Sequence, residues 1–217
     1  MGFDLIIFDC DGVLVDSERL TVGMEARILT ELGWPHTPEE VVAGFMGRSP
    51  SYQRGAITAR LGADAAALFD ERTDAEAHAL FDSDLIAVPG VEAVLADLAE
   101  RGVPTCVASS GTHERIRRTL GRTGLLAGFE GRIFSATEVE NGKPAPDLFL
   151  HAAVRMGIDP VRCAVIEDSV YGVRGAIAAG MAAFGFGGGL TPADRLSTAG
   201  ATVFTQMSDL IGVLEAA

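Results

Sequence analysis

Leu5-Ile6-Ile7-Phe8-Asp9-Cys10-Asp11-Gly12, close to the start of the chain, is the stretch that decides the fold. Four apolar residues in a row predict a β-strand that is buried on both faces, as strands of parallel sheets are. Two carboxylates follow at positions i and i+2, and Gly12 permits a tight turn there. Where the strand unwinds, Asp9 and Asp11 can therefore turn toward one site.

Further apolar runs alternate with helical patterns along most of the chain. Apolar residues recur at i, i+3, i+4 and i+7 from Val91 to Leu98, and Gly102 then ends that helix. The other predicted helices cover residues 112–123, 146–156 and 170–179, and the further strands cover 103–108, 132–135, 163–166, 182–186 and 202–204. This alternation predicts an α/β fold with a parallel sheet covered by helices, in which ligands bind beyond the carboxyl ends of the strands.

Residues 17–83 interrupt the alternation. They are rich in Ala, Glu, Arg and Leu, and turn signals stand at 33–35 and 47–50. We therefore predict four helices inserted after the first strand. The expected domains are a core of residues 1–16 and 84–217 and an inserted helical domain of residues 17–83.

Composition excludes several classes of function. The chain has 217 residues, 17 of them basic and 30 acidic, for a net charge of −13, and 48% are hydrophobic. It can bury a core, and its acidity argues against nucleic acid or an anionic membrane as a partner. Residues 175–193 carry no charge, but six glycines favour a helix, a strand and a turn over a membrane span.

The cysteines and the N-terminus indicate a compartment. Cys10, Cys106 and Cys163 are odd in number, lack metal-site spacing and lie in strand-like surroundings, which predicts buried free thiols in a reducing environment. The first residues contain no basic region of a signal peptide. We expect a cytoplasmic protein, and a monomer.

Two further motifs suit the binding of a phosphoryl group. Ser109 and Ser110 follow a predicted strand, where a hydroxyl and the amides of the next turn can hold phosphate oxygens; a helix N-cap is the alternative. Lys143 is the only lysine of the chain, and Pro144 and Pro146 stiffen its segment. A held ammonium can neutralise a carboxylate nucleophile and a phosphoryl group, whereas a solvated surface lysine is the alternative.

A second acidic pair, Glu167 and Asp168, ends another predicted strand. Together with Asp9 these residues offer the oxygen-only, highly charged ligand set that Mg²⁺ prefers. Asp168 or Ser169 could instead cap the helix that follows. Both roles are compatible, so the sequence predicts a magnesium site without excluding the cap.

In this order the four motifs resemble those of the haloacid dehalogenase superfamily of phosphohydrolases, over nearly the whole chain, and most closely its beta-phosphoglucomutase-like branch. The resemblance implies a Rossmann-like core of five or six strands, an α-helical cap formed by residues 17–83, and a Mg²⁺-dependent aspartyl-phosphate mechanism. By position, Asp9 would be the nucleophile and a metal ligand, and Asp11 the general acid/base with its carbonyl on the metal. Ser109 and Lys143, with Ser110, would bind the phosphoryl group. Asp168 would ligate Mg²⁺. Glu167 would either contact the ion directly or hydrogen-bond to one of its ligands.

Departures from the relatives' patterns separate the possible activities. Dehalogenases of the superfamily lack the second acid, which is Asp11 here, and phosphonatases use a lysine in the cap, where this chain has none. Mutases carry His, Arg and Lys where this chain has Thr21, Pro50 and Thr112, and those cations grip a second phosphate. The expected activity is therefore hydrolysis of a small phosphorylated metabolite, of the sugar phosphate or phosphoglycolate type. A sugar phosphomutase and a non-catalytic phospho-metabolite binder are the alternatives.

Three further residues could contact a substrate. Arg48 is a candidate in the inserted domain, although an ordinary surface arginine is the alternative. His113 and Arg115 lie just past the second motif and could line the same site, or could simply begin a solvated helix.

Overall fold

The computed structural model describes residues 2–46 and 50–217. The chain divides into two compact units, one that runs through Asp16 and resumes over Ile86–Ala217, and one that consists of Ser17–Leu85. We call the first the core unit and the second the inserted unit.

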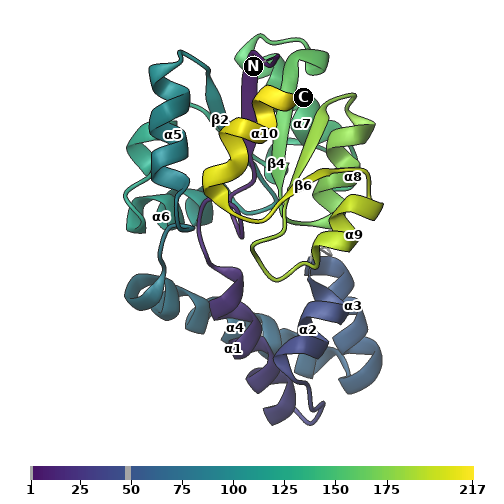
Figure 1. Cartoon of the computed structure of the whole chain (residues 1–217). Coiled ribbons are helices and arrows are strands. Elements are labelled where there is room, and N and C mark those ends of the chain that lie inside the picture. Colours follow the sequence, from purple (N-terminus) through teal and green to yellow (C-terminus); the bar gives the residue numbers. More distant parts are fainter. Residues whose placement is uncertain (1, 47–49) are drawn as a thin grey trace. The chain divides into compact units, whose positions relative to one another are not determined.

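The core unit contains a six-stranded sheet in which every pairing is parallel. The strand order is β3-β2-β1-β4-β5-β6, so β1 lies in the middle and the direction of winding reverses beside it. The strands are β1 (Leu5–Phe8), β2 (Thr105–Ser109), β3 (Ile133–Ser135), β4 (Cys163–Glu167), β5 (Ala182–Phe186) and β6 (Thr202–Phe204). The predicted α/β fold with a parallel sheet is confirmed (Figure 1).

Helices surround this sheet and bury both of its faces. All four residues of β1 are inaccessible to solvent, and their side chains alternate between the two faces. Leu5 and Ile7 pack in one cluster with Phe149 of α7 and Val173 of α8. The helices are α5 (Val91–Glu100), α6 (His113–Arg122), α7 (Asp147–Met156), α8 (Val170–Ala178), α9 (Ala193–Thr198) and α10 (Leu210–Ala216), with short 3₁₀ turns at Leu126–Phe129, Ala136–Glu138, Pro160–Arg162 and Met207–Asp209.

The uncharged segment 175–193 becomes the end of α8, strand β5, a turn and the start of α9. Within the described residues, no helix is both long and apolar enough to cross a membrane. Strands β2 and β4 each run one residue farther than predicted, so Ser109 and Glu167 occupy their last positions. The three cysteines are free thiols and are buried, as predicted.

The described part of the inserted unit forms four helices, which are α1 (Glu18–Glu31), α2 (Pro38–Phe45), α3 (Pro50–Leu61) and α4 (Ala63–Asp84). Thr37 and Glu40 form a capping box that begins α2, with Pro38 in the first turn. Trp34, in the turn between α1 and α2, packs edge-on against Phe45 of α2, with 6.1 Å between ring centroids.

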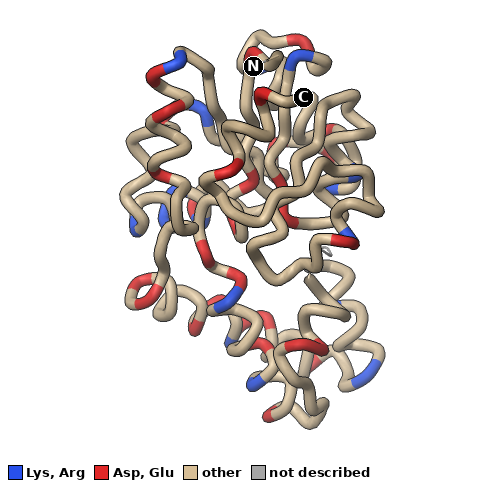
Figure 2. Tube along the Cα trace, in the orientation of Figure 1, with Lys and Arg blue, Asp and Glu red and all other residues tan. Residues whose placement is uncertain are grey.

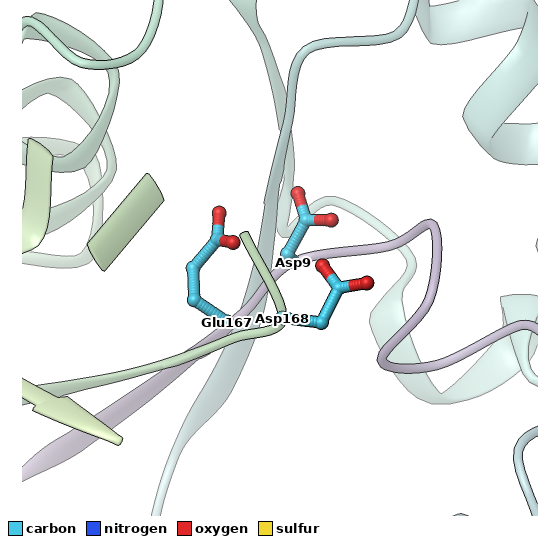
Figure 3. A group of neighbouring side chains, drawn as sticks. All are labelled: Asp9, Glu167 and Asp168. Carbon is cyan, nitrogen blue, oxygen red and sulfur yellow. The ribbon is translucent and has the colours of Figure 1, made fainter. Parts of the chain in front are cut away.

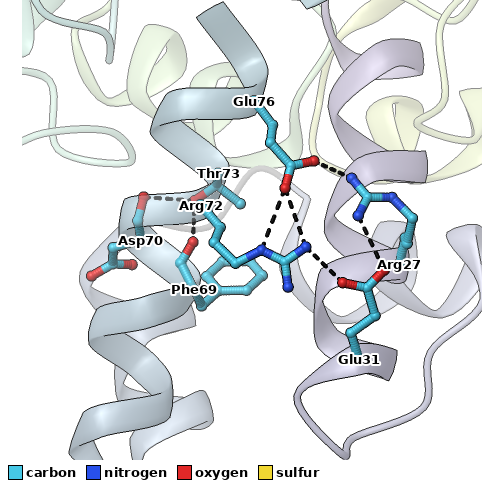
Figure 4. A network of polar contacts seen from close by, with 7 residues as sticks. All are labelled: Arg27, Glu31, Phe69, Asp70, Arg72, Thr73 and Glu76. Atoms are coloured by element: carbon cyan, nitrogen blue, oxygen red, sulfur yellow. Dashed lines mark hydrogen bonds and ion pairs between the residues drawn. The ribbon is translucent and has the colours of Figure 1, made fainter.

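An ion-pair network joins α1 to α4 inside the inserted unit (Figure 4). Arg72 lies 2.6 Å from Glu31 and 3.2 Å from Glu76, while Arg27 pairs with both of these acids. Acidic and basic residues are interspersed along the elements of both units (Figure 2). The Arg27–Glu31 pair is about half exposed, so solvent screens it, and we expect the network to orient the helices more than to stabilise them.

The core unit is interrupted and resumed at adjacent points. Val15 forms an antiparallel bridge with Ala87, and Asp16 N donates to Ile86 O at 3.0 Å. Val88 N donates to Leu14 O at 3.0 Å, which extends the pairing. The two connections to the inserted unit therefore leave the core unit side by side.

Candidate active site

The sequence motifs meet at the carboxyl edge of the sheet. Asp9 directly follows β1 and extends its ladder, because its N–H donates to Ile166 O of β4 at 2.9 Å. Ser109 ends β2 and Glu167 ends β4, and both strands are direct neighbours of β1. The site therefore lies where the winding of the sheet reverses, which is the usual place for ligands in such folds.

Three carboxylates form the centre of this site (Figure 3). Asp9, Glu167 and Asp168 are all buried, and one oxygen from each lies within 4.8 Å of the others. All three side chains end in a carboxyl group, so each offers oxygen donors. Since hard divalent cations prefer such a donor set, these residues fit a divalent cation.

Lys143 lies among these carboxylates and is not on the surface. Its ammonium donates to Asp9 Oδ1 at 2.5 Å, to Glu167 Oε1 at 2.6 Å and to Ala108 O at 3.1 Å. These contacts match the three N–H donors of a lysine ammonium. The side chain is only 6% exposed, and its ammonium lies 5.2 Å from the centroid of the Phe149 ring.

The site contains more negative than positive charge. Burial raises the pKa of Asp9 to about 7, and the nearby Glu167 adds to this rise while Lys143 opposes it. Burial alone would lower the pKa of Lys143, but Asp9 and Glu167 raise it above its usual value. One ammonium therefore serves two carboxylates while Asp168 lies beside them, and a divalent cation would offset the remaining charge.

A glycine makes room for Glu167. A Cβ atom at position 172 would lie 1.8 Å from Glu167 Oε1, so Gly172 lets this carboxylate fold over the start of α8. There Glu167 Oε2 accepts hydrogen bonds from Ser169 N at 3.0 Å and from Ser169 Oγ at 2.8 Å. Ser169 is also the N-cap of α8, so the cap is formed by Ser169 and not by Asp168. Gly172 is not recognisable as part of the site from the sequence.

The serine motif forms a turn that is held at both ends. Ser109 Oγ accepts from Gly111 N at 3.1 Å, and Ser135 Oγ of β3 donates to Gly111 O at 2.6 Å. Ser109 is buried beside the strand ends, whereas Ser110 is exposed. Thr112 caps α6 by accepting from Arg115 N at 3.3 Å.

Asp11 pairs with a residue of α6. Its Oδ1 lies 3.2 Å from Nη2 of Arg115, and this carboxylate is about one quarter exposed. From the sequence, Arg115 was expected only as a possible lining residue. His113 instead pairs with Glu138, with 2.6 Å between His113 Nε2 and Glu138 Oε1. Arg48, the candidate from the inserted domain, lies outside the described residues.

Known proteins resemble this chain over most of its length. A family model described as haloacid dehalogenase-like hydrolase matches residues 3–180. A 6-phosphogluconate phosphatase of Escherichia coli is 33% identical over 184 residues, which are 84% of this chain and 82% of that protein.

Two solved structures have the same fold. A haloacid dehalogenase-like protein of Agrobacterium tumefaciens superposes with a TM-score of 0.87 at 39% identity, over 99% of both chains. A hydrolase of the same family from Deinococcus radiodurans, solved with bound phosphate and sodium, superposes with a TM-score of 0.82 at 31% identity, over 99% of this chain and 96% of that one.

Proposed function

The chain belongs to the haloacid dehalogenase-like hydrolases, and from this premise we propose that it hydrolyses the phosphate ester of a small, sugar-derived metabolite. One observation carries the proposal. Asp9 is buried, contacts the buried Lys143 and is followed two residues later by a partly exposed second acid, Asp11. This combination supplies a nucleophile, a counter-charge and a proton donor within one site.

The reaction we propose has two steps. A carboxylate oxygen of Asp9 attacks phosphorus, the bond from phosphorus to the ester oxygen breaks, and Asp11 gives its proton to the departing oxygen. Water then attacks the phosphorus of the aspartyl phosphate, and Asp11 takes the proton of this water. Inorganic phosphate leaves, and both carboxyl groups return to their starting states.

Lys143 and the strand-end groups organise the charge in this proposal. Lys143 would hold Asp9 in place and neutralise the transferring phosphoryl group, which Ser109 and the amides of its turn would also bind, with Ser110 at the exposed side. Asp9, Asp168 and the carbonyl of Asp11 would hold Mg²⁺. Glu167 would not contact the ion itself, because its oxygens already accept hydrogen bonds from Lys143 and Ser169. When bound, the ion supplies positive charge that offsets the phosphoryl oxygens.

The alternatives receive less support. The mutase pattern requires cations where this chain has Thr21 and Thr112, and both hydroxyls serve their own helices, since Thr21 Oγ1 donates to Glu18 O and Thr112 caps α6. A non-catalytic binder has no use for Asp11 in addition to Asp9. The second acid likewise argues against dehalogenation, in which no proton goes to a leaving oxygen.

The proposal also covers the substrate class, the role of residues 17–83, the compartment and the oligomeric state. The relative from Escherichia coli is named a 6-phosphogluconate phosphatase, and the hydrolase from Deinococcus radiodurans binds phosphate, so a phosphorylated sugar derivative is the class to test first. We assign residues 17–83 the role of a cap that admits substrate and excludes bulk water, and Arg48 a substrate contact there. Buried free thiols suit a cytoplasmic enzyme, which we propose acts as a monomer.

Phosphate release from p-nitrophenyl phosphate and from a panel of sugar phosphates, with and without Mg²⁺, tests this function. We expect Mg²⁺-dependent turnover by the wild type and none by Asp9→Asn, which keeps the shape but removes the nucleophile. Asp194→Asn changes an exposed acid in the first turn of α9 and is the matched control. Full activity of Asp9→Asn would disprove the mechanism. Isomerised product that requires a bisphosphate would identify a mutase, and tight binding without turnover would identify a binder.

A further inference from the structure

Helix α6 contacts two consecutive residues of the first motif with one of its faces. Arg115 and Thr119 are four residues apart and so share a face of the helix. Arg115 lies 3.2 Å from Asp11, and Thr119 Oγ1 lies 3.6 Å from Cys10 Sγ. Thr119 and Cys10 are buried, whereas the side chain of Arg115 is 44% exposed. The helix is therefore anchored at Thr119 and extends Arg115 toward the partly exposed acid.

The stem of Arg115 lies along the serine turn. A Cβ atom at Gly111 would stand 3.6 Å from Arg115 Cδ and 3.5 Å from Ser109 Oγ. The backbone N–H of Arg115 is held by the cap residue Thr112. Arg115 is thus fixed at its backbone by the cap and along its stem by the turn that would bind phosphate, and its guanidinium reaches Asp11.

We propose that Arg115 is the positioning residue of the proton donor, holding the Asp11 carboxyl group in the direction from which it serves the departing oxygen. This inference rests on the proposed phosphatase function. Fixing one oxygen of a carboxyl group at 3.2 Å fixes the direction in which the other points. General acid catalysis requires hydrogen-bond reach to the reacting oxygen, so a small rotation of Asp11 reduces its contribution.

Arginine suits this role better than lysine. A guanidinium stays protonated throughout the working range, so it holds Asp11 without acting as a competing proton donor. Its planar set of five N–H donors also defines a direction, which a freely rotating ammonium does not. The chain places its only lysine beside Asp9 and an arginine beside Asp11, in keeping with a nucleophile that needs a compact charge and a proton donor that needs an orientation.

Two esters of similar shape but different leaving groups test the proposal. Phenolate is a poor leaving group that needs a proton, whereas p-nitrophenolate leaves readily without one. The value of kcat/KM includes only the steps through release of the alcohol, because that release is followed by a separate attack of water. For Arg115→Gln we expect kcat/KM to fall about tenfold with phenyl phosphate and less than about threefold with p-nitrophenyl phosphate, since general acid catalysis contributes about 10²–10⁴-fold in total.

Further variants separate positioning from other roles. Arg117→Gln alters the same helix at an exposed residue that pairs with Glu130, and should change neither ester. Arg115→Lys should give an intermediate selectivity between the esters. In the background of Asp11→Asn, Arg115→Gln should cause no further loss with phenyl phosphate, because the group on which it acts is absent. Thermal melting of every variant identifies any loss of folding.

Equal losses with both esters would overturn the proposal, and if the inhibition constant of inorganic phosphate rose as well, Arg115 would be assigned to phosphate binding. Unchanged rates for both esters in a folded Arg115→Gln or Arg115→Lys variant would also overturn it. All of these outcomes are ratios of kcat/KM or of the inhibition constant between a variant and the wild type, and they require a wild type that is active. Absence of turnover of both esters by the wild type would instead contradict the proposed phosphatase function, and this inference with it.

Discussion

The ammonium of Lys143 lies 2.5 Å from Asp9 Oδ1, although 134 positions separate the two residues in the sequence. The same ammonium contacts Glu167, so the ends of β1 and β4 are joined through one side chain. A buried ammonium between two buried carboxylates is stable only as a complete set, because each charge left alone would be costly. The proposed nucleophile is thereby held in position before substrate arrives.

Removing this ammonium should destabilise the core unit. Lys143→Met keeps most of the side-chain volume but leaves Asp9 and Glu167 facing each other, and we expect the free energy of unfolding to fall by about 3 kcal/mol. Urea denaturation followed by circular dichroism measures this change. Arg60→Met, at an exposed position of α3, is the control and should change it by less than about 0.5 kcal/mol. Equal stabilities of wild type and Lys143→Met would mean that the buried ion pairs contribute nothing.

The close contact between Gly172 and the Glu167 carboxylate can be tested by substitution. In Gly172→Ala the new methyl group would occupy the place of the Glu167 carboxylate, which must then move away from Lys143 and Ser169. We expect the rate of p-nitrophenyl phosphate hydrolysis to fall at least about tenfold and the melting temperature to fall.

Gly212→Ala is the matched control, since no atom lies within 4 Å of the Cβ that it would add to α10. It should leave activity unchanged and melting equal or slightly higher, because alanine favours helices more than glycine does. A Gly172→Ala enzyme as active as Gly212→Ala would show that the position of Glu167 does not matter for catalysis.

Divalent cations should stabilise the protein by binding at the group of carboxylates formed by Asp9, Glu167 and Asp168. We expect the melting temperature to rise with Mg²⁺ concentration, because a ligand that binds only the folded state at about 100 times its Kd adds about 2.7 kcal/mol. Asp168→Asn removes one charged donor and should raise the Mg²⁺ concentration needed for half of this stabilisation at least about tenfold. Asp194→Asn should leave that concentration unchanged. Differential scanning fluorimetry without substrate measures both. Identical curves for wild type and Asp168→Asn would place the ion elsewhere.

The three thiols should be unreactive in the folded protein. All are buried, and burial raises the pKa of each; that of Cys163 rises to about 11. At pH 8 the reactive thiolate form is therefore scarce, and its sulfur is also inaccessible. Titration with Ellman's reagent should detect fewer than about 0.3 thiols per chain in buffer and about three in 6 M guanidinium chloride. Rapid reaction of one thiol in buffer would contradict the buried environment of these residues.

Local patterns were enough to predict the sheet and to predict which motifs follow the carboxyl ends of its strands. A continuous apolar run such as 5–8 has few alternatives to a buried strand, and parallel strands place their carboxyl ends at one edge, which brings Asp9, Ser109 and Glu167 into one neighbourhood. Other features depend on side-chain directions that no spacing encodes. The contact between Arg115 and Asp11 needs the packing of α6 on the first motif, and the role of Gly172 needs the folded-back conformation of Glu167. Arg48 stays a prediction.

The hydrogen-bonded junction of Val15 with Ala87 and of Asp16 with Ile86 has a consequence for the evolution of the chain. Because the insertion begins and ends at neighbouring points of one small ladder, its length and sequence can vary without altering the register of any strand in the sheet. A donor segment from another protein needs only ends that are equally close together. If the inserted unit selects the substrate, as we propose, selectivity can be exchanged with that unit while the strand-end residues of the core unit stay unchanged.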